Sequence, residues 1–383
     1  MSHFTKAVPL PLTSPGTKRH LTFHRWGTLG TSPKVYIQAA LHADELPAVM
    51  TACHLIPLFD AAAREGQIVG EIILVTNANP VGMAQSLNTH HLGRHAFADG
   101  GGNFNRGWPD LGAIVLERFR GSFGDNAQQN IVLMRTELRN AVVALPETSE
   151  WQALQKALLT LSIDADIVFD LHCDFQAELH LFAHVEHKDM VSDLGCDMGA
   201  SVVILEQSIA AGLFDECNGG PWFKVRKALK LAADLMPAAC FAPTIELRGR
   251  SDVSDQFGAR DAANIMNFLR RNGAVLGEAP PLPAARCEAT AVSGCDMIPA
   301  PVAGMVAWHV GVGTQVVDGE HIADVIDFDS PEPLLARTPV FARQSGRLFS
   351  QRLGHLTRPG EILCQIAGKT SLVHRQNAQF LNP

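Results

Sequence analysis

The sequence lacks several features that mark common classes of protein. It has no Cys-x-x-Cys pair among its eight cysteines and no cluster of lysines and arginines, and acidic residues outnumber basic ones by 39 to 31. Scattered cysteines of this kind indicate reduced, buried thiols, because disulfide frameworks and zinc ribbons use paired spacings. Without a basic patch there is no electrostatic footprint for a nucleic-acid backbone. We therefore expect no nucleic-acid partner.

Long apolar segments are also missing. No run approaches the roughly 20 apolar residues that span a bilayer, and the N-terminus carries no apolar stretch followed by a small-residue cleavage site. These absences predict a cytoplasmic protein with no membrane partner. With 383 residues, of which 46% are hydrophobic, the chain is long enough to bury a sizeable core and to form two domains.

Short apolar runs alternate with helical patterns between residue 34 and about residue 273. The strand candidates are KVYIQAA, EIILVT, ADIVFDL, ELHLFAHV, SVVIL and ACFAPTIEL. Continuous apolar strands predict a sheet covered on both faces, and their alternation with helices predicts an α/β sandwich with a largely parallel sheet. Asp44 is the predicted N-cap of the first connecting helix. Residues 107–162 predict two or three further helices, either an insertion beside the sheet or ordinary crossover helices.

A change in composition marks a second domain. Residues 274–301 are rich in proline, alanine and glycine, so we predict an α/β domain over 1–277 and a C-terminal domain over 278–383. The C-terminal domain contains an internal repeat, in which glycines such as Gly304 and Gly346 recur at an offset of 42 or 41 residues. Short strands between glycine turns, present twice, predict a small all-β barrel or sandwich with pseudo-twofold symmetry.

The two repeats resemble the half-motifs of biotinyl/lipoyl carrier domains. Those domains carry a lysine on the hairpin between the halves, whereas the connection here reads DFDSPEPLLARTP and has no lysine. The resemblance therefore implies a C-terminal β-barrel without a prosthetic group, whose task is to cover, orient or oligomerise the first domain. A homo-oligomer is left open.

Four polar residues stand at the ends of predicted strands. His42 and Glu45 lie where YIQAA turns into a helix, His172 directly follows ADIVFDL, and Glu246 lies near the end of FAPTIEL. Open α/β sheets place their ligand sites at the carboxyl ends of strands, and buried ionisable groups are costly unless they are paired or used. Taken singly, each residue has an ordinary explanation, such as a satisfied core histidine or a salt bridge from Glu246 to a neighbouring arginine.

Taken together, these residues supply a complete set of groups for one chemistry. Two imidazoles and a carboxylate hold a catalytic zinc and leave a fourth position open for water. A further carboxylate is then needed to accept a proton and return it to the leaving group. We predict one zinc ion per chain, held by His42, Glu45 and His172, with Glu246 as general acid/base. Asp170, two residues before His172, either orients that ligand or is an ordinary structural aspartate.

Five motifs occur in order along residues 34 to about 273. They are H-x-x-E after a strand, NP-x-G in NANPVGM, the Asn-Arg pair in GGNFNRGWPD, the histidine of DLH, and a final E-L-R. In this order they resemble the succinylglutamate desuccinylase/aspartoacylase family, within the zinc carboxypeptidase superfamily. The resemblance implies a zinc-carboxypeptidase-like α/β/α sandwich with a mixed, largely parallel sheet, with the zinc ligands and acid/base residue named above.

The resemblance also implies how a substrate is held. Asn105 and Arg106 would bind a substrate carboxylate, which a planar guanidinium grips through two hydrogen bonds. Arg94 is the candidate for polarising the scissile carbonyl, because similar enzymes have an arginine some way before the Asn-Arg pair. The alternative for Arg94 is an exposed loop arginine with no role in the site.

Two departures from the family bear on the substrate. Aspartoacylases have Gly-x-His-Gly-Asn-Glu where this chain has Ala-Leu-His-Ala-Asp-Glu, so the metal loop is less permissive here. The single tyrosine, Tyr36, lies in the strand before the metal motif and is not placed to contact substrate, as a tyrosine does in many relatives. Both departures leave the predicted metal ligands intact and weaken the assignment of a substrate by analogy.

These observations predict a zinc-dependent amidohydrolase that removes an acyl group from an N-acyl amino acid or a similar small carboxylate-bearing amide. A zinc carboxypeptidase acting on peptides is the nearest alternative, and it would release C-terminal residues from dipeptides. A non-catalytic binding or carrier protein built around the C-terminal domain is the alternative from another class. The missing carrier lysine and the complete set of metal and acid/base groups argue against that alternative.

Overall fold

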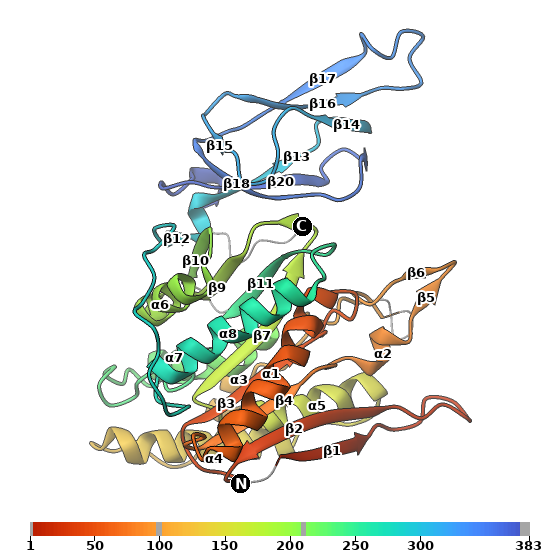
Figure 1. Cartoon of the computed structure of the whole chain (residues 1–383). Helices are drawn as coiled ribbons and strands as arrows, with labels where there is room; N and C mark the ends of the chain where they lie inside the picture. The colour runs from red at the N-terminus through yellow and green to blue at the C-terminus, as the bar shows by residue number, and fades with distance from the viewer. Residues whose placement is uncertain (1–2, 97–101, 208–211, 376–383) are drawn as a thin grey trace. The chain divides into compact units, whose positions relative to one another are not determined.

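The computed structural model describes residues 3–96, 102–207 and 212–375 (Figure 1). The chain groups into two compact units, which combine segments distant in the sequence. The first unit comprises residues 1–172, 209–245 and 253–282, and the second comprises residues 173–208, 246–252 and 283–383. The second unit therefore joins two short pieces of the α/β region to the C-terminal segment. The domain boundary expected between residues 277 and 278 stays a prediction.

A mixed sheet forms the centre of the first unit. Its strands follow the order β1-β2-β4-β3-β7, with antiparallel pairing from β1 to β4 and parallel pairing from β4 through β3 to β7. Every residue of β3, β4 and β7 is buried, as expected for strands covered on both faces. β1 was not predicted, because most of its residues are exposed and it has no apolar run. These strands are β1 (Phe4–Pro9), β2 (His20–Gly27), β3 (Lys34–Ala39), β4 (Glu71–Val75) and β7 (Ile167–Asp174).

Helices cover both faces of this sheet. On one face α1 (Leu46–Arg64) packs against α8 (Asp255–Arg271), and the rings of Phe169 in β7 and Phe268 in α8 are 5.6 Å apart. The other face is covered by α3 (Leu111–Arg118), α4 (Ala127–Val143), α5 (Glu150–Ser162) and α7 (Phe214–Ala228). The helices predicted within residues 107–162 are confirmed, and they follow β4 as part of its crossover to β7.

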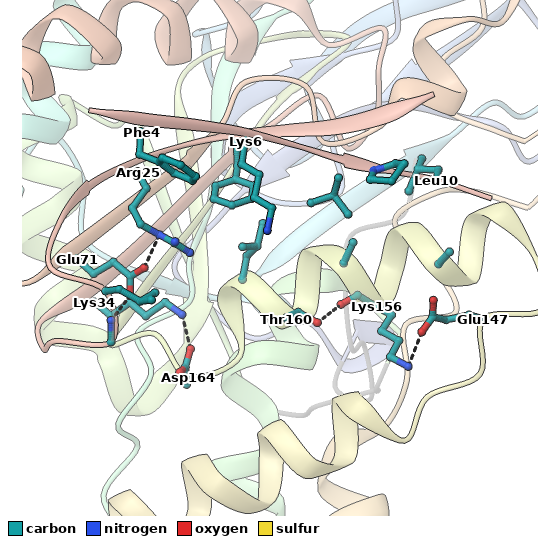
Figure 2. A pocket seen from close by; sticks show the side chains of 18 of the residues that line it. Phe4, Lys6, Leu10, Arg25, Lys34, Glu71, Glu147, Lys156, Thr160 and Asp164 are labelled. Atoms are coloured by element: carbon teal, nitrogen blue, oxygen red, sulfur yellow. Dashed lines mark hydrogen bonds and ion pairs between the residues drawn. The ribbon is translucent and has the colours of Figure 1, made fainter. Parts of the chain in front are cut away.

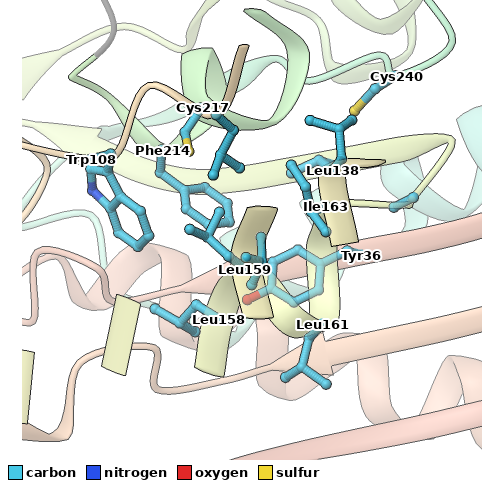
Figure 3. Close-up of a cluster of buried hydrophobic side chains, with 14 of the residues drawn as sticks. Tyr36, Trp108, Leu138, Leu158, Leu159, Leu161, Ile163, Phe214, Cys217 and Cys240 are labelled. Carbon is cyan, nitrogen blue, oxygen red and sulfur yellow. The ribbon is translucent and has the colours of Figure 1, made fainter. Parts of the chain in front are cut away.

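A large apolar cluster lies between the sheet and the second group of helices (Figure 3). Leu158 and Leu159 of α5 pack there with Tyr36 of β3, whose ring lies 5.9 Å from that of Phe214 at the start of α7. Each fully buried side chain of this size stabilises the fold by roughly 1.5–3 kcal/mol. The Tyr36 hydroxyl donates a hydrogen bond to Gln38, which connects this core to the site described below.

α1 is, within the described ranges, the one helix long and apolar enough to cross a membrane by length and composition. The expectation that no segment meets this test is therefore wrong. The helix packs against α8 and β3 and buries residues along its length, including Leu55 and Phe59. Core helices pass the same test, and this packing explains the apolar character of α1.

The second unit begins with parallel strands. β10 (Val202–Glu206) pairs in parallel with β9 (His180–His184) and with β12 (Thr290–Ala291), and α6 (Lys188–Met198) connects β9 to β10. β11 (Thr244–Gly249) starts in the first unit and ends in the second. Together with the sheet of the first unit, these pairings confirm the predicted mixed, largely parallel α/β fold.

The C-terminal segment forms two antiparallel sheets, ordered β13-β20-β18-β15 and β17-β16-β14-β19, with β8 (Gln176–Ala177) added to β18. The predicted internal repeat is visible as two successions of four strands. Within the first succession β14 pairs with β16, and within the second β18 pairs with β20 in the same way. Each succession also adds its third strand to the other: β15 pairs with β18, and β19 pairs with β14. This reciprocal exchange is consistent with pseudo-twofold symmetry. The likeness to biotinyl/lipoyl domains stays a prediction. The strands are β13 (Cys295–Pro299), β14 (Gly304–Trp308), β15 (Gln315–Val316), β16 (His321–Ile326), β17 (Arg337–Phe341), β18 (Gly346–Gln351), β19 (Leu356–Thr357) and β20 (Ile362–Ala367).

Candidate metal centre

His42, Glu45 and His172 come together in the first unit, at the carboxyl ends of β3 and β7. All three side chains are buried, and their candidate ligand atoms lie within 4.8 Å of one another. The Glu45 carboxylate spans both imidazoles, with Oε1 2.8 Å from His42 Nδ1 and Oε2 2.8 Å from His172 Nδ1. Two imidazole nitrogens and a carboxylate in this arrangement could hold a metal ion.

The loop after β3 places two of these groups through an unusual backbone. Ala40 adopts a φ of 62°, a left-handed conformation that is uncommon outside glycine. Glu45 then precedes α1 as its N-cap residue but makes no side-chain capping hydrogen bond, because its carboxylate faces the two imidazoles. The prediction of Asp44 as the N-cap is wrong by one residue. The position where aspartoacylases have glycine is left-handed here although it carries alanine.

Replacing Ala40 by glycine should stabilise the protein. A left-handed non-glycine residue costs roughly 1–2 kcal/mol, which the larger entropy of glycine in the unfolded chain offsets by roughly 0.5–1 kcal/mol. We expect the free energy of unfolding in urea to rise by about 0.5–1 kcal/mol. Ala39→Gly, one residue earlier in the buried strand β3, should instead lower it. A destabilised Ala40→Gly protein would contradict the strain argument.

An oxygen atom lies close to Nε2 of each imidazole. His42 Nε2 lies 2.7 Å from Asn103 Oδ1, and His172 Nε2 lies 2.9 Å from Asp170 Oδ2. With a proton on Nε2 facing these oxygens, Nδ1 of each ring presents its lone pair towards the metal position. Asp170 therefore contacts His172, the ligand that one of its two alternative roles assigned to it.

A chain of buried hydrogen bonds continues from Asp170 into the core. Gln38 Nε2 donates to Asp170 Oδ1 over 2.9 Å, and the Tyr36 hydroxyl donates to Gln38 Oε1 over 2.8 Å. Neither Gln38 nor Asn103 was predicted. A polar residue inside the apolar run KVYIQAA was a usable signal for Gln38. Asn103 stands two residues before Asn105 in an already recognised motif, but the sequence did not show that it faces His42.

Replacing Gln38 by leucine should weaken metal binding at the triad by about 10–100-fold, because Asp170 loses the group that orients it next to His172. Competition with a chromogenic chelator measures this affinity. Tyr36→Phe is the matched control, since it removes only the outer hydrogen bond of the chain and should retain most of the affinity. Wild-type affinity in Gln38→Leu would show that Asp170 needs no such support.

Burial and mutual charge set the protonation of the triad. Burial lowers the pKa of His42, which favours the neutral imidazole that binds metals. Burial opposes ionisation of Glu45, but His42 and His172 hold its pKa well below the ordinary value. Burial also opposes protonation of His172, yet Asp170 and Glu45 raise its pKa well above the ordinary value. A metal ion must therefore displace a proton from His172, so metal affinity should increase with pH.

Arg94 reaches the triad from the loop that follows the short hairpin of β5 (Ser86–Leu87) and β6 (His90–His91). Its Nη1 lies 3.1 Å from Glu45 Oε1, and its side chain is only 19% exposed. The loop approaches closely because Ala43 N donates to Gly93 O over 3.0 Å, and a Cβ on Gly93 would lie 2.5 Å from Asp44 N. Glycine is therefore required at that position. The alternative of Arg94 as an exposed loop residue is wrong, and its catalytic role stays a prediction.

Asn105 and Arg106 lie between this loop and α3. Asn105 is buried, and its Oδ1 accepts a hydrogen bond from Phe214 N over 2.9 Å, which ties the segment to the start of α7. Arg106 Nη1 donates to the Asn105 carbonyl over 2.7 Å. Burial and the nearby charge of Arg94 lower the pKa of Arg106. Two neighbouring guanidinium groups suit an anionic ligand. Substrate binding by Asn105 and Arg106 stays a prediction.

A buried acidic pair at the start of α7, Asp215 and Glu216, was not predicted. Acidic residues in the first turn of a helix are common, so no pattern along the chain singled them out. Burial, and then the charges of Glu216 and Asp170, raise the pKa of Asp215 to about 7. Both acids act electrostatically on Arg106 and oppose the lowering of its pKa.

Asp215→Asn should stabilise the protein strongly at pH 8 and much less at pH 5. The folded-state pKa of Asp215 is raised to about 7, so the folded protein holds a proton that the unfolded chain releases near pH 4. Stability therefore declines as the pH rises through that window, and asparagine removes the decline. We expect a gain of roughly 2–4 kcal/mol in urea unfolding at pH 8. The control is Asp234→Asn at an exposed position. An equal effect at both pH values would contradict this explanation.

Glu246 lies on β11, in the part of the strand that belongs to the second unit, and its side chain is partly buried. The structure thus brings His42, Glu45, His172 and Arg94 together within the first unit. The role of Glu246 as general acid/base stays a prediction.

A cavity of about 820 Å³ lies elsewhere in the first unit, lined mainly by β1, β2 and α5 (Figure 2). Lys34 and Glu71 at its rim begin β3 and β4, so it lies at the opposite ends of these strands from the metal centre. Three of its cationic side chains are in ion pairs: Arg25 with Glu71 at 2.7 Å, Lys156 with Glu147 at 2.6 Å, and Lys34 with Asp164. The cavity is therefore separate from the metal centre.

The sandwich and its triad define an α/β protein with a candidate metal centre at the carboxyl ends of parallel strands. Sequence comparison then gives the particular family, because the succinylglutamate desuccinylase/aspartoacylase catalytic domain matches residues 31–269. The chain belongs to this family, which implies a hydrolase-type enzyme acting on a small-molecule substrate. A search of curated proteins found no match.

Solved structures of similar proteins share the fold. A succinylglutamate desuccinylase/aspartoacylase family protein from Shewanella amazonensis matches with a TM-score of 0.82 and 21% identity, over 96% of this chain and 100% of its own. A second, from Shewanella frigidimarina, matches with a TM-score of 0.80 and 20% identity, over 96% and 97%. The product-bound ectoine utilization protein EutE (DoeB) from Ruegeria pomeroyi has a TM-score of 0.66 and 16% identity, over 96% and 95%. These likenesses extend through both units.

Proposed function

We propose that the protein is a zinc-dependent amidohydrolase that removes an acyl group from an N-acyl amino acid or a similar small carboxylate-bearing amide. The observation that carries the proposal is the buried triad of His42, Glu45 and His172 in a chain of this family. Zinc suits the triad because it takes imidazole and carboxylate ligands in a four-coordinate site with one open position. One ion at the triad fits this set of three ligands.

The residues around the triad support this chemistry. His42 and His172 would bind the ion through Nδ1, while Asn103 and Asp170 keep both rings in place from the Nε2 side. When bound, zinc polarises a carbonyl group and lowers the pKa of water at its open position. Arg94 lies 3.1 Å from Glu45 and would donate to the amide oxygen as negative charge develops there.

Substrate binding and proton transfer fall to other residues. Arg106 would grip the carboxylate of the substrate through its guanidinium, and Asn105 would hold the Arg106 segment against α7 as well as contact the ligand. Glu246 would accept a proton from the attacking water and return it to the leaving nitrogen. The order of the five sequence motifs, which ends in E-L-R at Glu246, supports this last assignment.

A substrate panel tests the proposal. The purified protein is analysed for metal by mass spectrometry and assayed against N-acetyl and N-succinyl amino acids, with dipeptides as the carboxypeptidase arm. We expect zinc at the triad, hydrolysis of at least one N-acyl amino acid, loss of activity with a chelator and its recovery with added zinc. A folded protein whose metal content is the same with and without Glu45 would overturn the proposal. Faster cleavage of dipeptides than of every N-acyl amino acid would replace it with the carboxypeptidase.

A further inference from the structure

A second group of metal-ligating side chains lies in the second unit, on the sheet that contains β14 and β16. His309 Nε2 lies 3.2 Å from Asp324 Oδ2, and His321 Nε2 lies 2.7 Å from Asp324 Oδ1. One candidate ligand atom from each residue lies within 4.8 Å of the other two. We propose that His309, His321 and Asp324 form a second zinc site, independent of the centre in the first unit.

A β-bulge brings His321 and Asp324 to the same side of their strand. Residues three apart on a regular strand point to opposite faces. Here the register with β17 shifts, since His321 pairs with Phe341 and Ala323 with Val340, which leaves one extra residue in β16. The extra residue reverses the alternation of side chains after the bulge, so the side chains of His321 and Asp324 lie on the same face of the strand.

The neighbouring strand fixes the third ligand. Trp308 of β14 pairs with Ala323, and the next residue, His309, donates its backbone N–H to Ile322 O over 2.9 Å. The rings of His309 and His321 then meet edge to face, with 4.5 Å between centroids. The backbone of two paired strands, rather than a mobile loop, therefore positions all three ligands.

The donor set is the same in kind as that of the first centre. Two imidazoles are spanned by one carboxylate, although here the nitrogen atoms are Nε2. The Asp324 side chain is 9% exposed, whereas those of His309 and His321 are 39% and 44% exposed. A carboxylate that is covered by protein and two imidazoles that face solvent suit zinc with water as its fourth ligand. Ligand binding across β14 and β16 would also stabilise these sheets.

Arg337 provides a way to distinguish a zinc site from a cluster of hydrogen bonds and ion pairs that binds no metal. Its Nη1 lies 3.2 Å from Asp324 Oδ2, next to the proposed ion. A guanidinium at this distance opposes binding of a cation through charge repulsion. Removal of Arg337 should therefore tighten zinc binding, whereas removal of either histidine should weaken it. In a network that binds no metal, all of these changes would have no effect on zinc affinity.

The experiment uses the full-length Glu45→Ala protein, in which the first centre is disabled, and titrates it with zinc by calorimetry. We expect one equivalent of zinc to bind. Affinity should fall at least about tenfold in His321→Ala or Asp324→Asn and rise at least about threefold in Arg337→Gln. His355→Ala should leave it unchanged, because His355 directly precedes β19 and its Nδ1 faces the Val306 carbonyl.

Cobalt provides a second readout that does not depend on the stability of the histidine variants. Visible absorption of bound cobalt is expected in Glu45→Ala and should strengthen in Arg337→Gln at the same cobalt concentration. Circular dichroism checks that each variant is folded. A folded Glu45→Ala protein that binds no zinc, or zinc affinity that is unchanged in both His321→Ala and Arg337→Gln, would overturn the second site. Because this background lacks the first centre, neither result depends on the proposed amidohydrolase activity.

Discussion

Replacing Glu45 by alanine is expected to abolish zinc binding at the triad and to lower kcat/KM by roughly 1,000-fold or more. Glu45 is the group that joins the two imidazoles, with one carboxylate oxygen 2.8 Å from each Nδ1. Its loss removes one ligand of three and the negative charge that balances a dication. It also leaves Arg94 facing the site without its carboxylate partner, and that positive charge repels the ion further.

Metal content and kinetics are measured on the same preparation of Glu45→Ala. The matched control is Glu65→Ala, which removes an exposed carboxylate at the other end of α1 and should change neither quantity. Glu45→Gln separates charge from shape, because an amide oxygen can still reach one imidazole, and it should bind zinc weakly. Retention of wild-type activity in Glu45→Ala would mean that the triad is not the catalytic centre.

The triad could be predicted because two simple patterns locate it. Mostly apolar strands give way to polar residues near their carboxyl ends, and the carboxyl ends of neighbouring parallel strands meet at one edge of the sheet. β3 and β7 are such neighbours, with Ala39 paired to Leu171, so His42 and His172 had to emerge close together. The spacing H-x-x-E then placed Glu45 on the turn into α1.

Asn103 could not be found in this way, and Arg94 was a candidate only through the resemblance to the family. Asn103 and Arg94 reach the site through loops, whose paths depend on contacts such as that between Gly93 and Ala43. Asp215 looks like an ordinary helix-start acid, and its raised pKa follows from burial that only the packed structure reveals. Loop geometry and burial are properties of the tertiary structure, and the local pattern of residues does not encode them.

The C-terminal segment also has one feature that the sequence predicts and one that it does not. Its repeat was predictable because glycines mark the turns of both halves, and the strands β13 to β16 recur as β17 to β20. The cluster of His309, His321 and Asp324 could not be predicted, because its geometry depends on one extra residue in β16. In a regular strand, the three-residue spacing from His321 to Asp324 would put the two side chains on opposite faces.

Glu246→Gln is expected to keep zinc and the fold but to lower kcat by roughly 100–10,000-fold, the usual contribution of a general acid/base. Glutamine has nearly the same size and hydrogen-bonding reach, so it preserves packing on β11 and removes only the ability to carry a proton. Because the lost step is proton transfer, KM should change little. The limb of the pH profile of kcat that reports ionisation of Glu246 in the wild type should disappear.

Glu178→Gln is the control for this variant, since it also neutralises a carboxylate in the second unit, where that carboxylate pairs with Arg347 and accepts a hydrogen bond from Ser201. It should leave kcat and its pH profile unchanged. If Glu246→Gln retained wild-type kcat while Glu45→Ala was inactive, the metal centre would stand and another base would have to carry the proton. A fall in zinc content in Glu246→Gln would instead make Glu246 a support of the metal centre. Comparing metal content and kcat in Glu45→Ala and Glu246→Gln therefore separates the effect on metal binding from the effect on proton transfer.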